Sequence, residues 1–460
     1  MTSSKSTKRA LLTSVLALLM CVTMLVGATF AWFTDSASTA VNKIQAGNLK
    51  VDLEMQNPNG SWVSAKGQTL EFKKAPNAPA DEKVLWEPGC TYELPQLRVV
   101  NKGNLALKYK VVFSAINGDE DAMKLAEVLD VSLNGNKVGT LKDALTSTDP
   151  DGFAHGNLPA EGNSGELKIT VQMQTTAGND YQGLSIGGIA VTLLATQDTV
   201  EYDSTTNQYD VNAEYPVAAN TQAELNDVIA SVQSGSAIPT EVVLPAGEFK
   251  LENGTAQNKN ITISGTKDTV VTVVGDTGNQ MNYQNGATLA FEGVTIQGQT
   301  SGNYGGIAHV EETTFVNCTF NGKLTLYGDA TFINCTFKND SDYAIWTWGA
   351  KNVEFVNCTF HSGGKALLLY GGAGSTEAPT TNLTVTDCVF KDNNMLTTDK
   401  AAIEIGNDYN AVYNLTVNNI TVNGFAVNPA GISTGSNIWA NKNSMDQAHL
   451  NVVIDGVDVY

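Results

Sequence analysis

Positive charge is scarce in this 460-residue sequence. Lysine and arginine together number 27 against 47 acidic residues, the net charge is −20, and Arg9 and Arg98 are the only arginines. A surface this acidic repels phosphate backbones, which argues against a nucleic-acid partner. The same acidity suits an exported protein and can collect divalent cations such as Ca²⁺, while no other cofactor is predicted.

Histidine is also scarce. The four histidines are His155, His309, His361 and His449, and none belongs to an H-E-x-x-H motif. This pattern argues against zinc proteolysis, and no metal site is predicted. His309 aligns with inward-facing positions of the repeats described below, so we expect it to be a buried structural histidine.

Apolar runs long enough to cross a bilayer are limited to one, at residues 10–27. Lys5, Lys8 and Arg9 precede it, and small residues end it before Ala31. This pattern is typical of a secretory signal peptide, residues 1–31, cleaved after Ala31. The alternative is that the run stays uncut as a membrane anchor. After cleavage, no membrane span is expected.

Internal repeats dominate the second half of the chain. The hexamers at 315–320, 332–337 and 355–360 read Phe-x-Asn-Cys-Thr-Phe, and weaker copies stand at 291–296, 385–390, 417–422 and 454–459. The intervals between their fourth positions run from 17 to 37 residues. A fixed core with irregular spacing indicates one structural unit that carries loops of variable length.

Each hexamer reads as two short strands joined by a bend. Side chains alternate within each strand, and the Asn, Gly or Asp at the third position tolerates left-handed backbone angles. Stacked turns about 4.8 Å apart place like residues on like. The sequence therefore predicts a right-handed parallel β-helix over 221–460 with two columns of stacked side chains. They are Asn317, Asn334 and Asn357, and Cys318, Cys335, Cys358 and Cys388.

The cysteine column raises the question of disulfides. The spacing between turns falls within the range that a bridge needs, but side chains stacked in parallel have the wrong torsion to close one. A linear column also cannot supply tetrahedral metal geometry. We therefore expect buried, reduced cysteines that act as small hydrophobic residues.

A third strand per turn carries the candidate binding site. It is expected at 307–310, 324–327, 345–348, 367–370 and 403–406, with its first residue facing inward. The outward candidates for glycan contact are Tyr327, Trp346, Trp348, Tyr370 and Glu404. Aromatic faces can stack on sugar rings while carboxylates bind hydroxyls. The alternatives are that a loop at 371–382 or the N-terminal domain covers these residues, or that they contact a protein.

The remaining segments complete the predicted domain organisation. Alternating runs in 32–203, interrupted by one helix near 119–129, predict an antiparallel β-sandwich, and 204–220 reads as a linker. Thr221 and Glu224 form a capping-box pattern at the start of an apolar-striped helix, 221–232. This helix and the following strand at 241–251 resemble the start of pectate-lyase-like β-helices.

The N-terminal region resembles the TasA/camelysin family of exported surface proteins. The resemblance rests on Ala28-Thr-Phe-Ala-Trp-Phe-Thr-Asp35, Ile44-Gln-Ala-Gly-Asn-Leu-Lys-Val-Asp-Leu53, Trp86-Glu-Pro-Gly-Cys90 and the segments 100–109 and 195–198. It implies processing by a SipW-type signal peptidase, a jelly-roll-like sandwich, and a place on the surface or in the biofilm matrix of a Gram-positive bacterium. It also implies self-association through a freed segment, roughly 32–52. The family commonly has Asp where Cys90 stands.

Two classes of function follow. The first is an exported surface or matrix protein whose β-helix binds glycan or acts as a rigid module. The second is a carbohydrate-active enzyme. Because 221–460 contains no arginine, a lyase would need a lysine base, and a hydrolase would need two carboxylates. The lysine candidates are Lys323, Lys365 and Lys400; the carboxylate candidates are Asp340, Asp342, Asp399, Glu404 and Asp408. Their spacing singles out no pair, so catalytic residues are not predicted.

Overall fold

The computed structural model describes most of residues 49–460. The residues left undescribed are 1–48, 67, 69, 75–83, 116–119, 148–151, 187–188, 199–214, 276–280, 301–304, 340–342, 364–365, 371–379, 393–399, 407–410, 427–435 and 443. The predicted signal peptide, its cleavage site at Ala31 and most of the proposed self-association segment therefore lie outside the described residues. No helix in the described part is long and apolar enough to cross a membrane.

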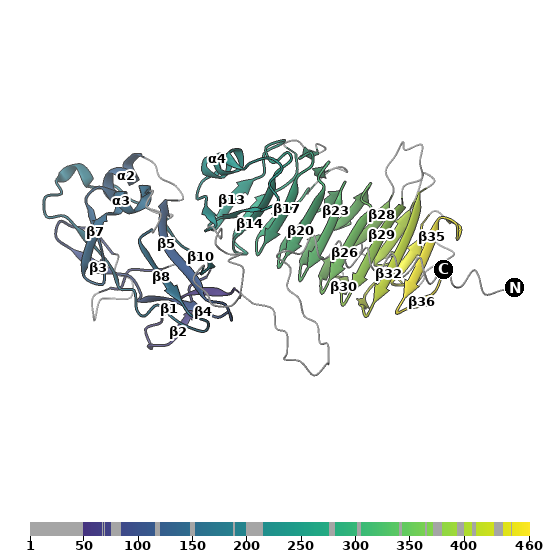
Figure 1. The fold of residues 1–460 in the computed structure, drawn as a ribbon, viewed down its shortest axis with the longest axis horizontal. Helices are drawn as coiled ribbons and strands as arrows, with labels where there is room; N and C mark the ends of the chain where they lie inside the picture. Colours follow the sequence, from purple (N-terminus) through teal and green to yellow (C-terminus); the bar gives the residue numbers. More distant parts are fainter. Residues whose placement is uncertain are drawn as a thin grey trace, which may run out of the picture.

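The first unit is an antiparallel β-sandwich, as the alternating runs predict (Figure 1). Its described strands form sheets in the orders β2-β1-β4, β10-β5-β8 and β3-β9-β6-β7. The strands are β1 Val51–Gln56, β2 Trp62–Ser64, β3 Thr91–Glu93, β4 Leu97–Asn101, β5 Leu107–Ala115, β6 Leu129–Leu133, β7 Asn136–Thr140, β8 Ala154–Leu158, β9 Ile169–Met173 and β10 Ile189–Gln197. Alternate residues of β4 and β9 are buried, so each strand turns one face to a shared apolar core.

Two short helices and one 3₁₀ turn join these strands. They are α2 Glu120–Ala126, α3 Leu141–Thr146 and the turn η1 Asn179–Tyr181. The helix expected near 119–129 corresponds to α2, whereas α3 has no counterpart among the expected elements. A complete capping box starts α3, in which the Thr140 hydroxyl accepts from Asp143 N and the Asp143 carboxylate accepts from Thr140 N. Such boxes stabilise helices too short to persist alone.

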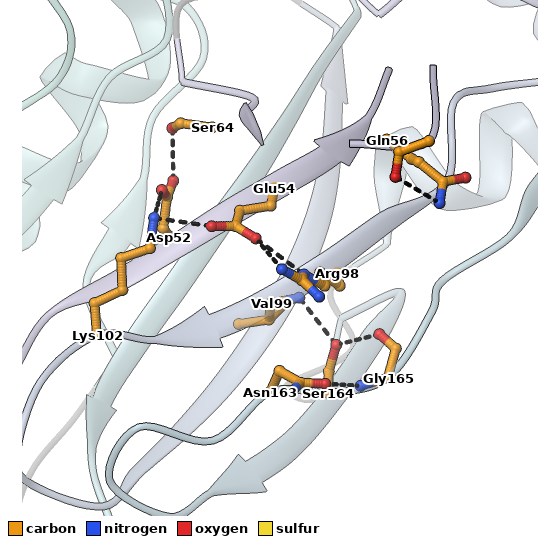
Figure 2. A network of polar contacts seen from close by, with 11 residues as sticks. Asp52, Glu54, Gln56, Ser64, Arg98, Val99, Lys102, Asn163, Ser164 and Gly165 are labelled. Atoms are coloured by element: carbon orange, nitrogen blue, oxygen red, sulfur yellow. Dashed lines mark hydrogen bonds and ion pairs between the residues drawn. The ribbon is translucent and has the colours of Figure 1, made fainter. Parts of the chain in front are cut away.

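A network of charged side chains joins β1 to β4 on the sandwich (Figure 2). Glu54 accepts two hydrogen bonds from the Arg98 guanidinium, at 2.9 and 2.7 Å, and lies 2.9 Å from Lys102 Nζ, which also pairs with Asp52. Burial raises the pKa of Glu54, but the bonds from Lys102 and Arg98 outweigh it and leave that pKa below its ordinary value. Arg98 also lies 4.4 Å from the centroid of the Trp62 ring. The network therefore holds three neighbouring strands in register.

The second unit is a parallel β-helix, as the repeats predict (Figure 1). Its described strands form three sheets, which we name by their size. The eleven-stranded sheet contains β11 Val217–Ala218, β12 Thr240–Val243, β14 Asn260–Ser264, β17 Thr288–Glu292, β20 Glu312–Val316, β23 Asp329–Ile333, β26 Asn352–Val356, β29 Thr380–Thr386, β32 Val412–Asn418, β35 Leu450–Ile454 and β36 Val457–Asp458. All its pairings are parallel except the last, β35 with β36.

The other two sheets complete each turn of the helix. The eight-stranded sheet contains β13 Gly247–Lys250, β15 Thr269–Thr272, β18 Thr295–Gln297, β21 Thr319–Asn321, β24 Thr336–Asn339, β27 Thr359–Ser362, β30 Val389–Asp392 and β33 Thr421–Asn423. The seven-stranded sheet contains β16 Asn282–Tyr283, β19 Gly306–Ala308, β22 Leu324–Leu326, β25 Ile345–Trp348, β28 Leu367–Tyr370, β31 Ile403–Gly406 and β34 Trp439–Asn441. Six of the seven hexamers thus span the end of the eleven-stranded sheet, a bend and the start of the eight-stranded sheet. The seventh, 454–459, was expected to do the same but forms an antiparallel hairpin of β35 and β36 within the eleven-stranded sheet.

Helix α4, Gln222–Ser231, covers the first turn (Figure 1). Thr221 is its N-cap and accepts a hydrogen bond from Glu224 N. The Glu224 carboxylate accepts from Asn220 N at 2.7 Å, one residue earlier than a standard capping box requires. Leu225 and Ile229 are fully buried in the core of the β-helix, so the helix closes that core.

Stacked side chains fill the β-helix. Phe315, Phe332 and Phe355 stack at centroid distances of 5.0 and 4.5 Å, and a second phenylalanine column runs from Phe320 to Phe390. Cys318, Cys335, Cys358 and Cys388 are buried and unbridged between these columns. Burial raises the pKa of the Cys335 thiol, and its neighbouring thiols raise it further. Thiols in such surroundings stay protonated and unreactive.

The bends carry left-handed residues on successive turns. Asn317, Asn334 and Asn357 have φ angles of 54°, 55° and 52°. Asn334 Nδ2 donates to Asn317 Oδ1 at 3.3 Å, and Asn357 Nδ2 donates to Asn334 Oδ1 at 2.7 Å. A second ladder, absent from the sequence-based expectation, stands three residues before each hexamer. It comprises Asp329, Asn352, Asn382 and Asn414, each amide donating to the residue on the preceding turn.

The two units meet beside the first turn of the β-helix. Tyr215, next to β11, lies under two lysines of β5, with Lys110 Nζ and Lys108 Nζ at 4.8 and 5.3 Å from its ring centroid. Strand β10 of the sandwich also approaches β11. The described part of the junction is therefore small and cationic–aromatic in character.

Candidate ligand-binding face

The outer side of the seven-stranded sheet carries two rows of side chains. Strand alternation turns Ile345 and Thr347 inward and leaves Trp346 and Trp348 on the outside, half-buried. The first row contains Gly306, Thr325, Trp346, Leu368, Glu404 and Ala440, and the second contains Tyr283, Ala308, Tyr327, Trp348, Tyr370 and Gly406. The sheet therefore places all five predicted contact residues on one face.

The register at the start of this face differs from the expected one. Ile307 pairs with Leu326, not with Leu324, so Ala308 and not Val310 stands beside Tyr327. Strand β19 ends at Ala308 because His309 takes a left-handed conformation with φ of 59°. A slip of two residues keeps Ile307 and Ala308 on their predicted sides of the sheet. Val310, expected to point outward, lies beyond β19 and packs against the core of the β-helix.

The second row forms an aromatic surface. The Trp348 and Tyr370 rings stack with centroids 5.2 Å apart and planes 14° apart. Trp346 packs edge-on against both, at 5.8 and 5.9 Å. Tyr327 precedes Trp348 by one turn, and its ring lies against Gly306, where a Cβ atom would stand 3.2 Å from it. These half-buried rings offer flat faces held rigidly by strands on consecutive turns.

The first row is largely covered. Thr325, Leu368 and Glu404 are 1%, 4% and 1% exposed, although all three point away from the core of the β-helix. Glu404 accepts a hydrogen bond from the Tyr343 hydroxyl and lies 4.0 Å from Lys400 Nζ. The role of Glu404 as a ligand contact stays a prediction. Its carboxylate is engaged within the protein.

Ammonium groups gather along the covered row. Lys323 is 3% exposed, and its Nζ lies 5.2 Å from the centroid of the Trp346 ring. Lys442 Nζ donates to the Tyr343 hydroxyl at 3.4 Å. A buried lysine is stabilised by the negative face of an indole ring. Lys323 thus packs against Trp346, and Trp346 in turn supports Trp348 and Tyr370.

Two aromatic residues at the start of this face were not anticipated from the sequence. Tyr283 is 39% exposed on β16, and its ring stacks on the His309 imidazole at 5.5 Å. His309 itself is exposed, so the prediction of a buried structural histidine is wrong. The left-handed bend at His309 turns its ring outward instead of inward. No hexamer precedes Tyr283 in the sequence, and strand β16, with only two residues, is too short to show a periodic pattern.

Several of the proposed catalytic residues lie outside the described residues. They are Asp340, Asp342, Lys365, Asp399 and Asp408. Of the remaining candidates on this face, Glu404, Lys323 and Lys400 are described, and the described residues bring no second carboxylate to Glu404. No group of three or more His, Cys, Asp or Glu side chains suited to a metal ion occurs in the described part of the chain.

Comparisons with known proteins support the β-helix fold. A family model described as a right-handed β-helix region matches residues 253–445. The C-terminal half of this chain is a right-handed β-helix. No curated protein matches the chain. Among solved structures, the catalytic domain of a GH87 α-1,3-glucanase in complex with nigerose aligns at 10% identity over 88% of this chain and 98% of that one, with a TM-score of 0.20. The same domain in complex with tetrasaccharides, as a variant, aligns at 9% identity over the same shares with a TM-score of 0.18. Scores this low transfer no activity to the β-helix described here.

Proposed function

We propose that the β-helix is a glycan-binding module and that its binding surface is the aromatic row of the seven-stranded sheet. The observation that carries the proposal is the stacked pair Trp348 and Tyr370, half-buried and supported edge-on by Trp346. A large aromatic surface held rigidly by strands binds at low entropic cost, because few side-chain rotations are lost. Sugar rings present C–H faces that pack on such surfaces.

The length of the row favours a chain over a single sugar. Tyr283, Tyr327, Trp348 and Tyr370 lie on nearly consecutive turns. Four steps of about 4.8 Å separate the first from the last, so the row extends about 19 Å. We infer that an oligosaccharide would lie across the strands and contact several rings at once.

Polysaccharide binding by the whole protein, with and without Trp348→Ala, tests this proposal. Loss of one stacking ring is expected to weaken binding about tenfold, since an aromatic contact contributes about 0.5–1.5 kcal/mol beyond its buried area. Trp62→Ala removes an indole ring from the sandwich and is the matched control. Binding that survives Trp348→Ala and Tyr370→Ala unchanged, or no binding to any polysaccharide tested, would refute the proposal.

A carbohydrate-active enzyme is the second candidate, and the buried contact of Glu404 with Tyr343 favours it. A carboxylate held beside a hydroxyl and the Lys400 ammonium can act as a general acid or base once the covering side chains move. Release of reducing or unsaturated ends from a bound polysaccharide, abolished in Glu404→Gln, would replace the binding proposal with this one. Unchanged polysaccharide after prolonged incubation would exclude it.

Export and surface attachment belong to the same proposal. The basic and apolar N-terminal pattern and the family resemblance of residues 28–203 support a secreted protein of the cell surface or matrix. N-terminal sequencing of the protein recovered outside the cell is expected to begin at Trp32. Recovery of the whole chain in the membrane fraction, starting at Met1, would instead indicate an uncut anchor.

A further inference from the structure

The eight-stranded sheet carries a row of cationic and amide side chains on its outer face. Pairing of β21, β24, β27, β30 and β33 aligns five residues, one on each strand, beside one another. They are Asn321, Lys338, His361, Lys391 and Asn423. The three central residues are Lys338, His361 and Lys391, and we call them the basic row.

The basic row reaches solvent and forms no ion pair with a carboxylate among the described residues. Lys338 and Lys391 are exposed and His361 is half-buried. None of the three side chains forms a hydrogen bond or an ion pair within the described part of the chain. In contrast, the sandwich pairs Lys73, Lys102 and Lys137 with carboxylates at 2.5–2.7 Å. In a chain with 47 acidic and 27 basic residues, cations set side by side without counterions require an explanation.

Electrostatic cost does not oppose this arrangement. Lys338 and Lys391 are two strands apart, about 9.6 Å, where two unit charges in water repel by about 0.4 kcal/mol. Two described carboxylates next to this sheet form no ion pair with the row. Glu248 stands on β13, four strands from β24, and Asp387, in the bend before β30, accepts a hydrogen bond from Asn419 Nδ2. The positive potential of the row is therefore available to an external anion.

Hydroxyl groups flank the basic row. Thr319, Thr336 and Thr359 pair in register on the same outer face, two residues before Asn321, Lys338 and His361. Each hydroxyl can both donate and accept a hydrogen bond. A surface with sparse cations beside a line of hydroxyls and amides matches a ligand with sparse anions and many hydroxyls.

We propose that the basic row binds an acidic polysaccharide, whose carboxylates contact Lys338 and Lys391 while its hydroxyls contact the threonine row. The polymer would run across the strands, with anionic groups one or two strand separations apart, about 4.8 or 9.6 Å. Double-stranded DNA carries one charge per 1.7 Å, far denser than this row, and the net charge of −20 repels it. This surface is separate from the aromatic row, so the inference stands apart from the proposed function.

The test compares charge-neutral variants of the whole protein. Lys338→Gln with Lys391→Gln removes two charges from the basic row and keeps side-chain length. Lys267→Gln with Lys351→Gln removes the same charge from exposed positions away from it, in the turn before β15 and the bend before β26. Binding to polygalacturonate at low ionic strength is expected to weaken about tenfold in the first pair and less than twofold in the second. Added salt should weaken binding of the unmodified protein.

The outcomes separate this inference from the proposed function. Equal losses in both pairs would show a general charge effect and overturn the inference, as would DNA binding as tight as polygalacturonate binding. Loss of polygalacturonate binding in Trp348→Ala, with none in Lys338→Gln/Lys391→Gln, would place the acidic ligand on the aromatic row. That result would overturn the inference and leave the proposed function intact. Loss of neutral-glycan binding in Trp348→Ala alone bears only on the proposed function.

Discussion

Asn357 offers a sharp test of why asparagine recurs at the bends of the β-helix. It has two roles that different substitutions separate. Its φ of 52° lies in the left-handed region, and its Nδ2 donates to Asn334 Oδ1 at 2.7 Å. Asn357→Ala removes the bond and forces a Cβ-bearing residue without polar support into the left-handed region. Asn357→Gly removes the bond but accepts the backbone conformation without steric cost.

The expected magnitudes follow from these two terms. A left-handed conformation costs an ordinary residue about 1–2 kcal/mol, and an exposed hydrogen bond contributes about 0.5–1 kcal/mol. Asn357→Ala should therefore destabilise its turn by about 1.5–3 kcal/mol. Asn357→Gly loses the bond and gains unfolded-state freedom of about 0.5–1 kcal/mol, so its cost should be about 1–2 kcal/mol. The difference of about 0.5–1 kcal/mol corresponds to roughly a two- to fivefold change in an equilibrium constant.

The neighbouring cysteine supplies the assay. Cys358 is 1% exposed and lies next to Asn357, so a thiol reagent reaches it only when that turn opens. Labelling rates in a Cys90→Ser background, which removes the half-buried thiol of the sandwich, should rise in the order wild type, glycine, alanine. Equal rates for the glycine and alanine variants would refute the claim that backbone conformation selects asparagine here.

Three further predictions concern the core, the charged network and the junction. Phe355→Ala should destabilise the β-helix by about 3–5 kcal/mol, because its fully buried ring stacks on Phe332 at 4.5 Å; chemical unfolding of the variant measures this. The lowered pKa of Glu54 means that its pairing stabilises the sandwich above its ordinary pKa of 4.5, and that this stability is lost as pH falls through the lowered value. Thermal unfolding of Glu54→Gln should accordingly depend less on pH in that acid range, and an unchanged profile would contradict the assignment. Tyr215→Ala should leave both units folded while making residues near 215 more susceptible to proteolysis, since it removes two cation–π contacts of about 0.5–1 kcal/mol each.

The β-helix could be predicted from the sequence because the hexamers repeat the same pattern of residues. Apolar residues at fixed positions, an asparagine at the bend and a constant order of strands leave few alternatives to stacked turns. Prediction failed where a local backbone angle decided the outcome. The bend at His309 ended β19 early, shifted the pairing of Ile307 by two residues and exposed a ring expected to be buried.

The burial of side chains on the outer face of the sheet was the second property that could not be predicted from the sequence. Alternation predicts the direction in which Glu404 points, but not that Tyr343, from two strands away, packs over it. That contact spans 61 residues, and no local pattern encodes it. The second asparagine ladder, in contrast, could have been predicted from the sequence. Asn352, Asn382 and Asn414 each stand three residues before a repeat, an offset that a register-based comparison of the turns would have revealed.

The variable spacing of the repeats has a consequence for how such a chain can change over time. From Phe291 to Val422, successive turns present similar bends and phenylalanine, cysteine or aliphatic columns to one another, whether 17 or 32 residues separate their cores. A duplicated or deleted turn would therefore find matching partners above and below it, and the added length would be absorbed in the connecting loops. The β-helix can thus become longer or shorter by whole turns while its core packing is kept. The number of aromatic and basic positions on its faces would change with its length.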